Sequence, residues 1–174
     1  TALVIGAEGL SQIVDWTDRT TAILFGDGAG AAIIKKDEKA RFETVMHSDG
    51  SMGGALTCEN SIQYRGINDS KKTFVSMNGQ EVFRKVPECI EELISKMKIE
   101  KSEIDLFLLH QANKRILESI GKRLKVSMDL IPENVSEYGN TSSASIPILL
   151  DEMVRDGKIQ KGNKIIMAGF QYIL

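Results

Sequence analysis

The sequence predicts an α/β fold, with one mixed and mostly parallel sheet and helices packed on it. Three observations lead to this fold class. Hydrophobic residues make up 42% of the 174 residues, which is enough for the core of one domain. In the second half of the chain, apolar runs alternate with segments of helical periodicity. One run, Asp105–Leu109, is typical of a strand buried on both faces.

The composition excludes several classes of protein. Charged residues make up 26% of the chain and the net charge is −2, without a Lys/Arg-rich block, which argues against nucleic-acid binding. No apolar run reaches the roughly 18 residues of a membrane span, so we expect a soluble protein that does not enter membranes. Two cysteines are too few for a disulfide framework or a four-ligand zinc site. We therefore expect a cytoplasmic protein without a metal.

The first elements are predicted to be β-strands. Ala2–Gly6 has the composition of a buried strand. The apolar runs Thr21–Phe25 and Ala29–Ile34 are joined by Gly26-Asp27-Gly28, which predicts a hairpin because such turns need positive φ angles. A phosphate-binding loop is the alternative interpretation, but it requires a helix after the glycines. A second strand-like run follows instead, so we favour the hairpin.

The middle of the chain combines a strand, a long loop and a helix. We predict a strand over Arg41–His47, with His47 at the start of a turn. The stretch 48–72 is rich in Gly, Ser and Asn and is predicted to be a loop of the kind that often binds ligands. Apolar residues at three- to four-residue spacing predict a helix over Gly79–Lys98, which Pro87 should bend or delay.

Two further helices and a strand complete the pattern. We predict helices over Asn113–Leu124 and Ser142–Arg155, the second with cap candidates at 140–142, and a last strand over Lys164–Met167. The inward faces of these helices are predicted to carry Ile116, Leu117, Ile120, Leu124, Ile146, Leu149, Leu150 and Met153. The chain starts without Met and is apolar at both ends, so we expect a fragment of a larger sheet.

His110 is the first candidate for a functional role. It follows the predicted buried strand, and ligand sites in α/β sheets gather at the carboxyl ends of parallel strands. A histidine at this place either lines a pocket or is a satisfied core residue. Its position alone leaves both interpretations open.

Asn140 occupies a similar place, in a tight turn that leads into a helix. Taken by itself, Asn140 is best interpreted as a helix cap, with Gly139 permitting the turn. The second interpretation is that its amide donates a hydrogen bond to an oxyanion.

Together these residues belong to an ordered set of motifs. The motifs are Gly-Asp-Gly-Ala-Gly (26–30), His-Ser-Asp-Gly-Ser (47–51), Met-Asn-Gly-Gln-Glu-Val-Phe (77–83), His-Gln-Ala-Asn (110–113), Gly-Asn-Thr-Ser (139–142) and Leu-Asp-Glu-Met-Val-Arg-Asp-Gly-Lys-Ile (150–159). With this set, residues 1–174 resemble the C-terminal half of β-ketoacyl-[acyl-carrier-protein] synthase III, a thiolase-like condensing enzyme.

The resemblance implies a layered α-β-α-β-α fold and a Cys-His-Asn triad. Such enzymes take an acyl group from acyl-CoA, typically acetyl-CoA, onto a cysteine. They then condense it with malonyl-[acyl-carrier-protein], which starts fatty acid synthesis and releases carbon dioxide and CoA. His110 and Asn140 match the triad and would donate hydrogen bonds to the thioester oxygen during decarboxylation. CoA thioester is a substrate here, and no resident cofactor is implied.

The resemblance also implies binding surfaces. Asn113 and Gly79 match positions that line the entry tunnel for CoA, with Phe83 beside them and Phe170 as a further contact. Exposed basic residues on one helix match the docking face for acyl carrier protein; they are Arg115, Lys122 and Arg123. An ordinary solvated helix face remains the alternative for these three residues. The full-length enzyme is expected to be a homodimer.

Two departures from the family qualify this assignment. The triad cysteine belongs to the other half of the family's sequence, and neither Cys58, in a loop, nor Cys89, on an inward helix face, fits it. After Gly169-Phe170, the family has a glycine run, whereas this chain has Gln171–Leu174. We therefore expect the isolated chain to be inactive as an enzyme. A non-catalytic module that binds carrier protein or forms dimers is the alternative function.

Overall fold

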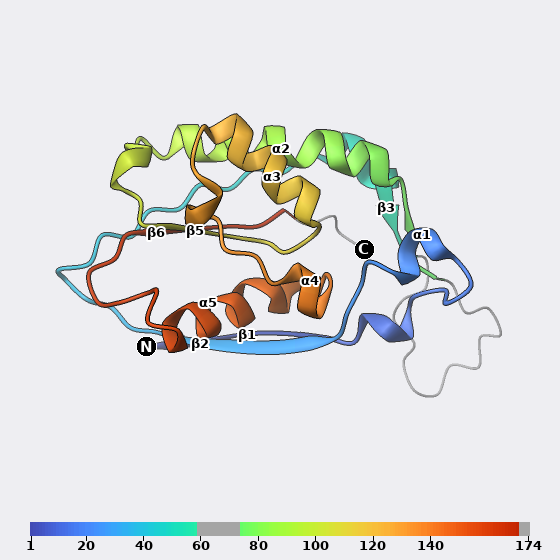
Figure 1. Ribbon diagram of the computed structural model, residues 1–174, viewed down its shortest axis with the longest axis horizontal. Helices are drawn as coiled ribbons and strands as arrows, with labels where there is room; N and C mark the ends of the chain where they lie inside the picture. Colours follow the sequence, from blue (N-terminus) through green and yellow to red (C-terminus); the bar gives the residue numbers. More distant parts are fainter. Residues whose placement is uncertain (59–73, 171–174) are drawn as a thin grey trace.

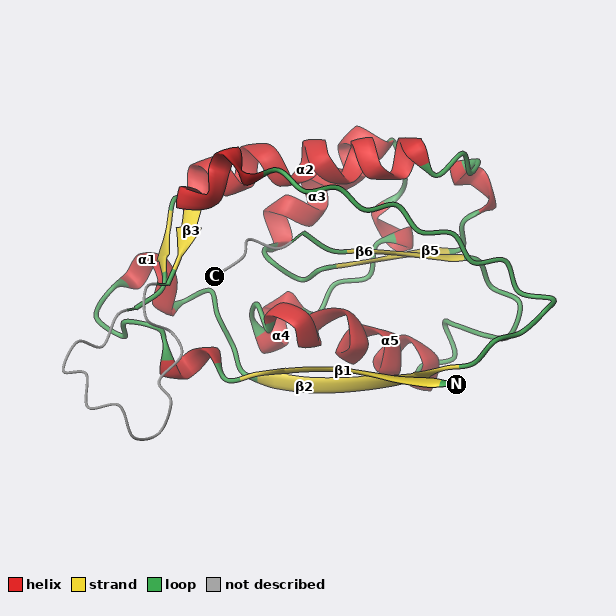
Figure 2. Ribbon diagram, turned by 180° about the vertical axis from the view of Figure 1, so that it is seen from behind, coloured by secondary structure: helices red, strands yellow, loops and turns green. Residues whose placement is uncertain are grey.

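The structure is a computed structural model that describes residues 1–58 and 74–170. Its main elements form four layers, in the order helices, sheet, helix and sheet (Figure 1). The outer helices α2 and α3 cover the parallel strands β5 and β6. The helix α5 separates these strands from the antiparallel pair β1 and β2 (Figure 2). Within the described ranges, no helix has the length and apolar character needed to cross a membrane.

The first sheet consists of β1 (Ala2–Glu8) and β2 (Gly28–Ile34), which pair antiparallel from Ala2 opposite Ile34 to Glu8 opposite Gly28. The strand predicted over Ala2–Gly6 exists, but the prediction that it is buried is wrong. Leu3 is 62% exposed and Ile33, its partner across the sheet, is 74% exposed. Side chains alternate between the faces of a strand, so only one face of this pair packs on α5.

The predicted hairpin is wrong. Residues Arg19–Ala22 form the short helix α1, because the Asp18 carboxylate accepts hydrogen bonds from the backbone N–H and the hydroxyl of Thr20 and caps the turn. The strand after the glycines forms as predicted, but its partner is β1, not Thr21–Phe25. The glycines 26, 28 and 30 also lack positive φ angles, so no hairpin turn forms there. No helix follows them either, so the structure also lacks the geometry of a phosphate-binding loop.

The strand predicted over Arg41–His47 is also wrong. This segment is irregular, and Phe42 and Met46 point into solvent. None of the described strands pairs with this segment. Its backbone N–H and C=O groups therefore lack the hydrogen bonds to a neighbouring strand that would hold it as a β-strand. The predicted loop from residue 48 contains a 3₁₀ helix, Gly50–Ala55, and the two-residue strand β3 (Leu56–Thr57), which pairs with β4 (Ser76–Met77). Residues 59–72 of that prediction lie outside the described residues.

Helix α2 (Gly79–Lys96) confirms the prediction to within two residues. Asn78 caps it by accepting a hydrogen bond from the N–H of Glu81, and Pro87 lies inside the helix with its side chain buried. Figure 1 shows α2 as one continuous helix. Pro87 therefore does not delay the start of the helix.

Helix α3 (Lys114–Leu124) and the parallel pair β5 (Leu106–Leu109) and β6 (Ile165–Ala168) also confirm the predictions. All four residues of β5 are buried, and they pair in register from Leu106 opposite Ile165 to Leu109 opposite Ala168. The inward residues of α3, with α2 and β5, form the main hydrophobic core; the α3 members are Ile116, Leu117, Ile120 and Leu124.

Helix α5 (Ser145–Arg155) is the central layer, preceded by the 3₁₀ turn Ser142–Ala144 and the short helix α4 (Val135–Tyr138). Its residues Leu149 and Met153 pack on β5, as the sequence predicts. Because α5 lies between the β1–β2 and β5–β6 pairs, the described strands do not form the one sheet that was predicted. The α/β class and the parallel pairing of the last strands are confirmed.

Candidate functional site

The candidate site is a cleft of about 440 Å³ beside the carboxyl ends of β5 and β6. Its walls come from the loop after β5, the start of α2, the turn before α5 and the segment after β6. Six residues that the sequence singled out as catalytic or CoA-binding line this cleft, namely Gly79, Phe83, His110, Asn113, Asn140 and Phe170. The structure thus brings together residues separated by up to 91 positions in the chain.

His110 is held at the end of strand β5 by backbone and side-chain contacts. Its N–H donates to the carbonyl of Ala168 at 2.9 Å, which extends the parallel ladder by one residue. Its ring Nδ1 lies 2.7 Å from the Oγ of Ser145, in the first turn of α5. The imidazole is therefore fixed between the sheet and the central helix.

Burial lowers the pKa of His110 from its usual 6.5 to about 4, and a hydrogen bond with the Ser142 backbone partly opposes this shift. Desolvation disfavours the charged form of a histidine. At neutral pH the ring is therefore uncharged, and one ring nitrogen carries a proton while the other accepts. A neutral imidazole can donate one hydrogen bond to an oxygen in the cleft.

Asn140 is held by its backbone and by one side-chain oxygen. Its N–H donates to the carbonyl of Leu24 at 2.7 Å, and its own carbonyl accepts from the N–H of Gly26 at 3.0 Å. Its Oδ1 accepts from the N–H of Ser142 at 2.9 Å, so the amide makes the predicted turn contact. Among the described residues, no group accepts a hydrogen bond from Nδ2. The amide oxygen of Asn140 therefore stabilises the turn before α5, and the donation of a hydrogen bond from Nδ2 to an oxyanion stays a prediction.

The close approach of the chain segments at Asn140 depends on two glycines. A Cβ atom at Gly26 would lie 2.0 Å from the carbonyl oxygen of Tyr138, so no other residue fits without moving the backbone. Gly139 has a φ of 70°, in the region that side chains rarely adopt. The Gly-Asp-Gly motif therefore serves packing against the Asn140 turn.

The rest of the cleft is mostly apolar. Val82, Phe83 and Val86 come from α2, and Ile116 and Ile146 come from α3 and α5. Asn113 adds a polar group at the rim and also caps α3, since its Oδ1 accepts from the N–H of Arg115 at 2.9 Å. Such a lining suits a flexible, largely uncharged ligand with a few polar groups.

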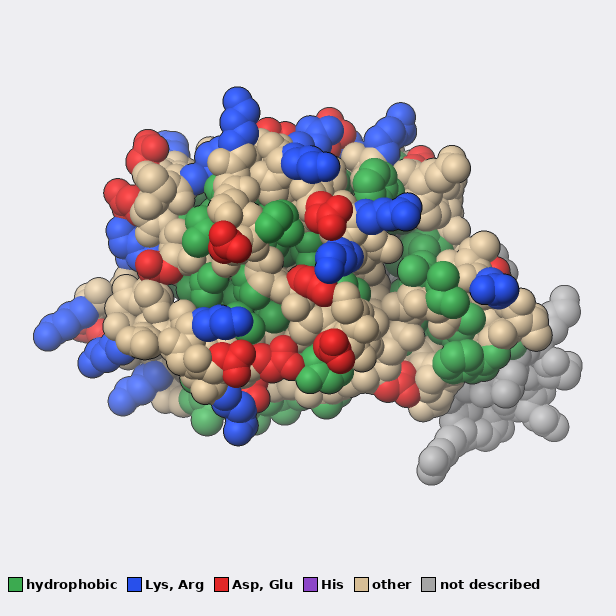
Figure 3. Space-filling model, viewed as in Figure 1, with side chains coloured by type: hydrophobic (Ala, Val, Ile, Leu, Met, Phe, Trp, Pro, Cys, Tyr) green, Lys and Arg blue, Asp and Glu red, His purple; other side chains and the backbone are tan. Residues whose placement is uncertain are grey.

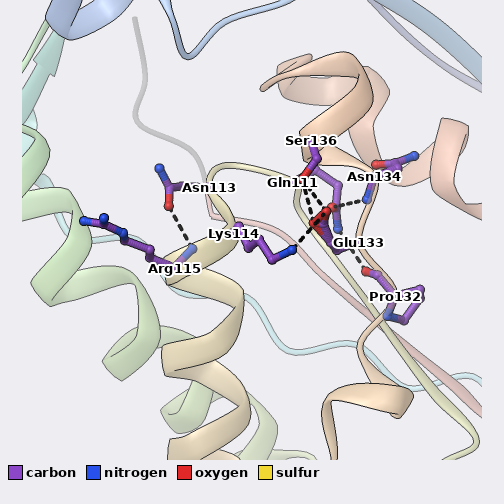
Figure 4. Close-up of polar contacts among 8 residues, drawn as sticks. All are labelled: Gln111, Asn113, Lys114, Arg115, Pro132, Glu133, Asn134 and Ser136. Carbon is purple, nitrogen blue, oxygen red and sulfur yellow. Dashed lines mark hydrogen bonds and ion pairs between the residues drawn. The ribbon is translucent and has the colours of Figure 1, made fainter.

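Two residues near the site were missed by the sequence analysis. Gln111 is fully buried, and its side chain donates to the carbonyl of Leu109 at 2.8 Å and accepts from the N–H of Asn134 at 3.0 Å. It thereby ties the loop after β5 to the segment that leads into α4 (Figure 4). Ser145 is also buried and contacts His110. Gln111 could have been suspected from its place beside His110, whereas nothing in the sequence marks Ser145.

The three predicted docking residues lie exposed on α3. Arg123 pairs with Glu91 of α2 at 3.0 Å, while Arg115 and Lys122 make no ion pair with any described residue. Arg115 borders a second hollow, next to Lys114, which faces Glu133 at 3.8 Å (Figure 4). On the face seen in Figure 3, basic and acidic side chains are interspersed over the helical layer.

The two cysteines and the second histidine lie away from the cleft. Cys58 is buried and Cys89 is partly buried on α2, and burial raises the pKa of both thiols. Neither of them lines the cleft. His47 is exposed in the irregular segment before the 3₁₀ helix Gly50–Ala55. The predicted departure at Gln171–Leu174 lies outside the described residues.

Comparison with known proteins identifies two family models that match different parts of the chain. Residues 94–172 match 3-oxoacyl-[acyl-carrier-protein (ACP)] synthase III C terminal, and residues 1–50 match 3-oxoacyl-[acyl-carrier-protein (ACP)] synthase III. Together these matches include both His110 and the β1–β2 sheet.

Individual relatives agree with the family models. The chain is 47% identical to β-ketoacyl-[acyl-carrier-protein] synthase III of Microcystis aeruginosa over 97% of this chain and 54% of that protein. The crystal structure of the Thermus thermophilus synthase III superposes with a TM-score of 0.86 at 39% identity, over 98% of this chain and 55% of that one. The priming β-ketosynthase of the R1128 polyketide pathway superposes with a TM-score of 0.86 at 30% identity, over 97% of this chain and 53% of that one. The chain thus spans about half the length of the relatives it matches.

Proposed function

Because this chain belongs to the β-ketoacyl-[acyl-carrier-protein] synthase III family, we propose that it forms the decarboxylating half of such an enzyme. The whole enzyme condenses acyl-CoA with malonyl-[acyl-carrier-protein] and releases carbon dioxide and CoA. The proposal rests on one observation: His110 and Asn140 line the same cleft. The neutral His110 ring and the Asn140 amide can each donate a hydrogen bond to a ligand there.

The proposed step is the decarboxylation of the malonyl thioester. The bond between the carboxylate and the α-carbon breaks, carbon dioxide leaves, and the electron pair moves onto the thioester oxygen as an enolate. The neutral His110 ring and the Asn140 Nδ2 each donate a hydrogen bond to this oxygen. Donors that are held in place before the reaction stabilise the developing charge most.

The cleft lining supports binding of a pantetheine arm. Its apolar walls and the polar group of Asn113 suit a long chain with alternating methylene and amide groups. We assign Gly79, Phe83 and Phe170 to the same binding surface, because they line the cleft together with His110.

The test of the proposed function is a chimera. This chain replaces the matching 54% of the Microcystis aeruginosa synthase, which supplies the rest of the enzyme. In this chimera, His110→Ala and Asn140→Ala should each lower malonyl decarboxylation about 100-fold, as is found when one oxyanion donor is removed. Acylation of the cysteine by acetyl-CoA should remain measurable in both variants.

His47→Ala is the matched control, because it removes the other histidine, which is exposed. This variant should decarboxylate malonyl thioester at the unsubstituted rate. If His110→Ala and Asn140→Ala abolish acylation but leave decarboxylation intact, the proposed roles are wrong.

We further propose that α3 docks the carrier protein. Arg115 and Lys122 lie two helical turns apart on the same side of α3, and both are exposed without an ion-pair partner among the described residues. Arg115→Glu with Lys122→Glu should weaken binding of an acidic acyl carrier protein at least tenfold at low salt, and added salt should reduce the difference. Isothermal titration calorimetry measures the dissociation constant for the carrier protein. The control is Lys158→Glu, which lies beyond α5 and should leave this dissociation constant unchanged.

The same titration tests the non-catalytic alternative. Carrier-protein binding together with an inactive chimera would favour a binding module over an enzyme half. We also propose a homodimer for the full-length protein, which analytical ultracentrifugation of the chimera tests. A monomer at all concentrations would contradict that part of the proposal.

A further inference from the structure

The hydroxyl of Ser145 is buried and lies between two groups of the loop after β5. Its Oγ is 2.7 Å from His110 Nδ1 and accepts a hydrogen bond from the N–H of Gln111 at 3.3 Å. The side chain is 2% exposed, so water does not complete its hydrogen bonding. Every hydrogen-bonding group of Ser145 must therefore find its partner within the protein.

The single hydroxyl proton decides how this arrangement works. Within the described ranges, the only acceptor in reach of the Ser145 hydroxyl is Nδ1 of His110. If Nδ1 carried the ring proton, Ser145 would accept two hydrogen bonds and its own proton would be buried without an acceptor, which is costly. If Nδ1 is bare, the hydroxyl donates to it and all groups are satisfied.

We propose that Ser145 is a positioning residue that holds His110 in the tautomer with its proton on Nε2. The hydroxyl donates to Nδ1, and the N–H of Gln111 donates to the hydroxyl, so the backbone after β5 fixes the direction of the chain of hydrogen bonds. Ser145 does not touch the substrate in this proposal. It acts through His110, by deciding which ring nitrogen is the donor.

The place of Ser145 in α5 supports the assignment. The central helix packs on both strand pairs, so the hydroxyl is held in position beside His110 Nδ1.

The inference rests on the proposed function only in its use of the Nε2 proton. An enolate oxygen needs a donor, and a histidine locked with its proton on Nδ1 and a bare Nε2 would repel that oxygen. The tautomer itself can be measured in this chain without substrate, so it is tested separately from the activity.

The experiment is nitrogen NMR on the chain with ¹⁵N-labelled imidazole rings. The chain has only two histidines, and His47→Gln removes the second set of signals. At neutral pH we expect a proton-bearing Nε2 and a bare Nδ1 in His110, with the tautomer ratio at about tenfold or more. Ser145→Ala should lower this ratio toward that of an unconstrained imidazole.

Two further variants separate positioning from a merely structural effect. Ser145→Thr keeps the hydroxyl, so its His110 tautomer ratio should match that of the unsubstituted chain. Ser143→Ala removes a neighbouring hydroxyl that makes no hydrogen bond to His110, so it should leave the tautomer ratio unchanged. A proton on Nδ1 in the unsubstituted chain, or an unchanged ratio in a folded Ser145→Ala chain, would overturn the proposal. A chimera that lacks decarboxylation but shows the Nε2 tautomer would instead count against the proposed function alone.

Discussion

At the scale of the residue, the neutral state of His110 has a consequence for stability. Burial holds the pKa of the folded state near 4, whereas an unfolded histidine has a value near 6.5. Between these two values the unfolded chain binds more protons than the folded one. The free energy of unfolding therefore falls as pH decreases through this window, by up to about 3 kcal/mol.

The difference between the chain and its His110→Gln variant isolates this contribution. Urea unfolding at several pH values should show a larger loss of stability from pH 6.5 to 4 in the unsubstituted chain. Carboxylates with lowered pKa values, such as Asp18 and Asp27, also cost stability in acid, but they contribute equally to both proteins. Equal pH profiles for the two proteins would show that His110 is not buried as described.

Residue identity alone located the residues of the candidate cleft, but it did not identify the residue that holds His110 in place. The motif His-Gln-Ala-Asn pointed to His110, and the structure confirms that it lines a cleft. Ser145 could not be found in this way, because a serine in the first turn of a helix is common and its partner lies 35 residues away. A contact across two layers is not encoded by any local pattern.

At the scale of the element, the bridge between Phe25 and Asn140 depends on the absence of a side chain at residue 26. We expect Gly26→Ala to destabilise the chain by about 3 kcal/mol, since the new Cβ would meet backbone that cannot rotate away. Chemical denaturation measures the loss. In the chimera, the same variant should impair decarboxylation, because the Asn140 turn has to move.

Gly53→Ala is the matched control for this prediction. A Cβ atom at Gly53 meets nothing within 4 Å, so the change should stay within about 0.5 kcal/mol. If Gly26→Ala is as stable as Gly53→Ala, the segment after α1 does not pack on the Asn140 turn as described.

Helices were easier to predict than strands in this chain. The periodicity of α2 and α3 reports their buried faces directly, and their caps, Asn78 and Asn113, are local. The strand predicted over Thr21–Phe25 failed because the Asp18 cap favoured a helical turn. Strand pairing is set by distant partners, which is why β2 joined β1 and not its sequence neighbour.

At the scale of the whole molecule, we expect that neither cysteine of the chain acts as a nucleophile beside the two proposed catalytic residues. We expect no condensation of acetyl-CoA with malonyl-[acyl-carrier-protein] by the chain alone, and no acetyl adduct on Cys58 or Cys89 by mass spectrometry. Burial raises the pKa of both thiols, so little thiolate is present to attack a thioester. Turnover that Cys58→Ser or Cys89→Ser removes would contradict this expectation, and the intact chimera is the positive control.

The sequence by itself determined the α/β class, the helices of the second half, the buried parallel strand and the residues that carry the proposed chemistry. These depend on local composition, on periodicity and on motifs that survive in order along the chain. Only the tertiary structure decided that the strands form separate pairs around α5, that Leu3 and Ile33 face outward, and that Ser145 meets His110. The physical reason is that strand pairing, burial and hydrogen bonding between layers depend on contacts between residues far apart in sequence. These contacts stabilise the chain only after the layers have packed together.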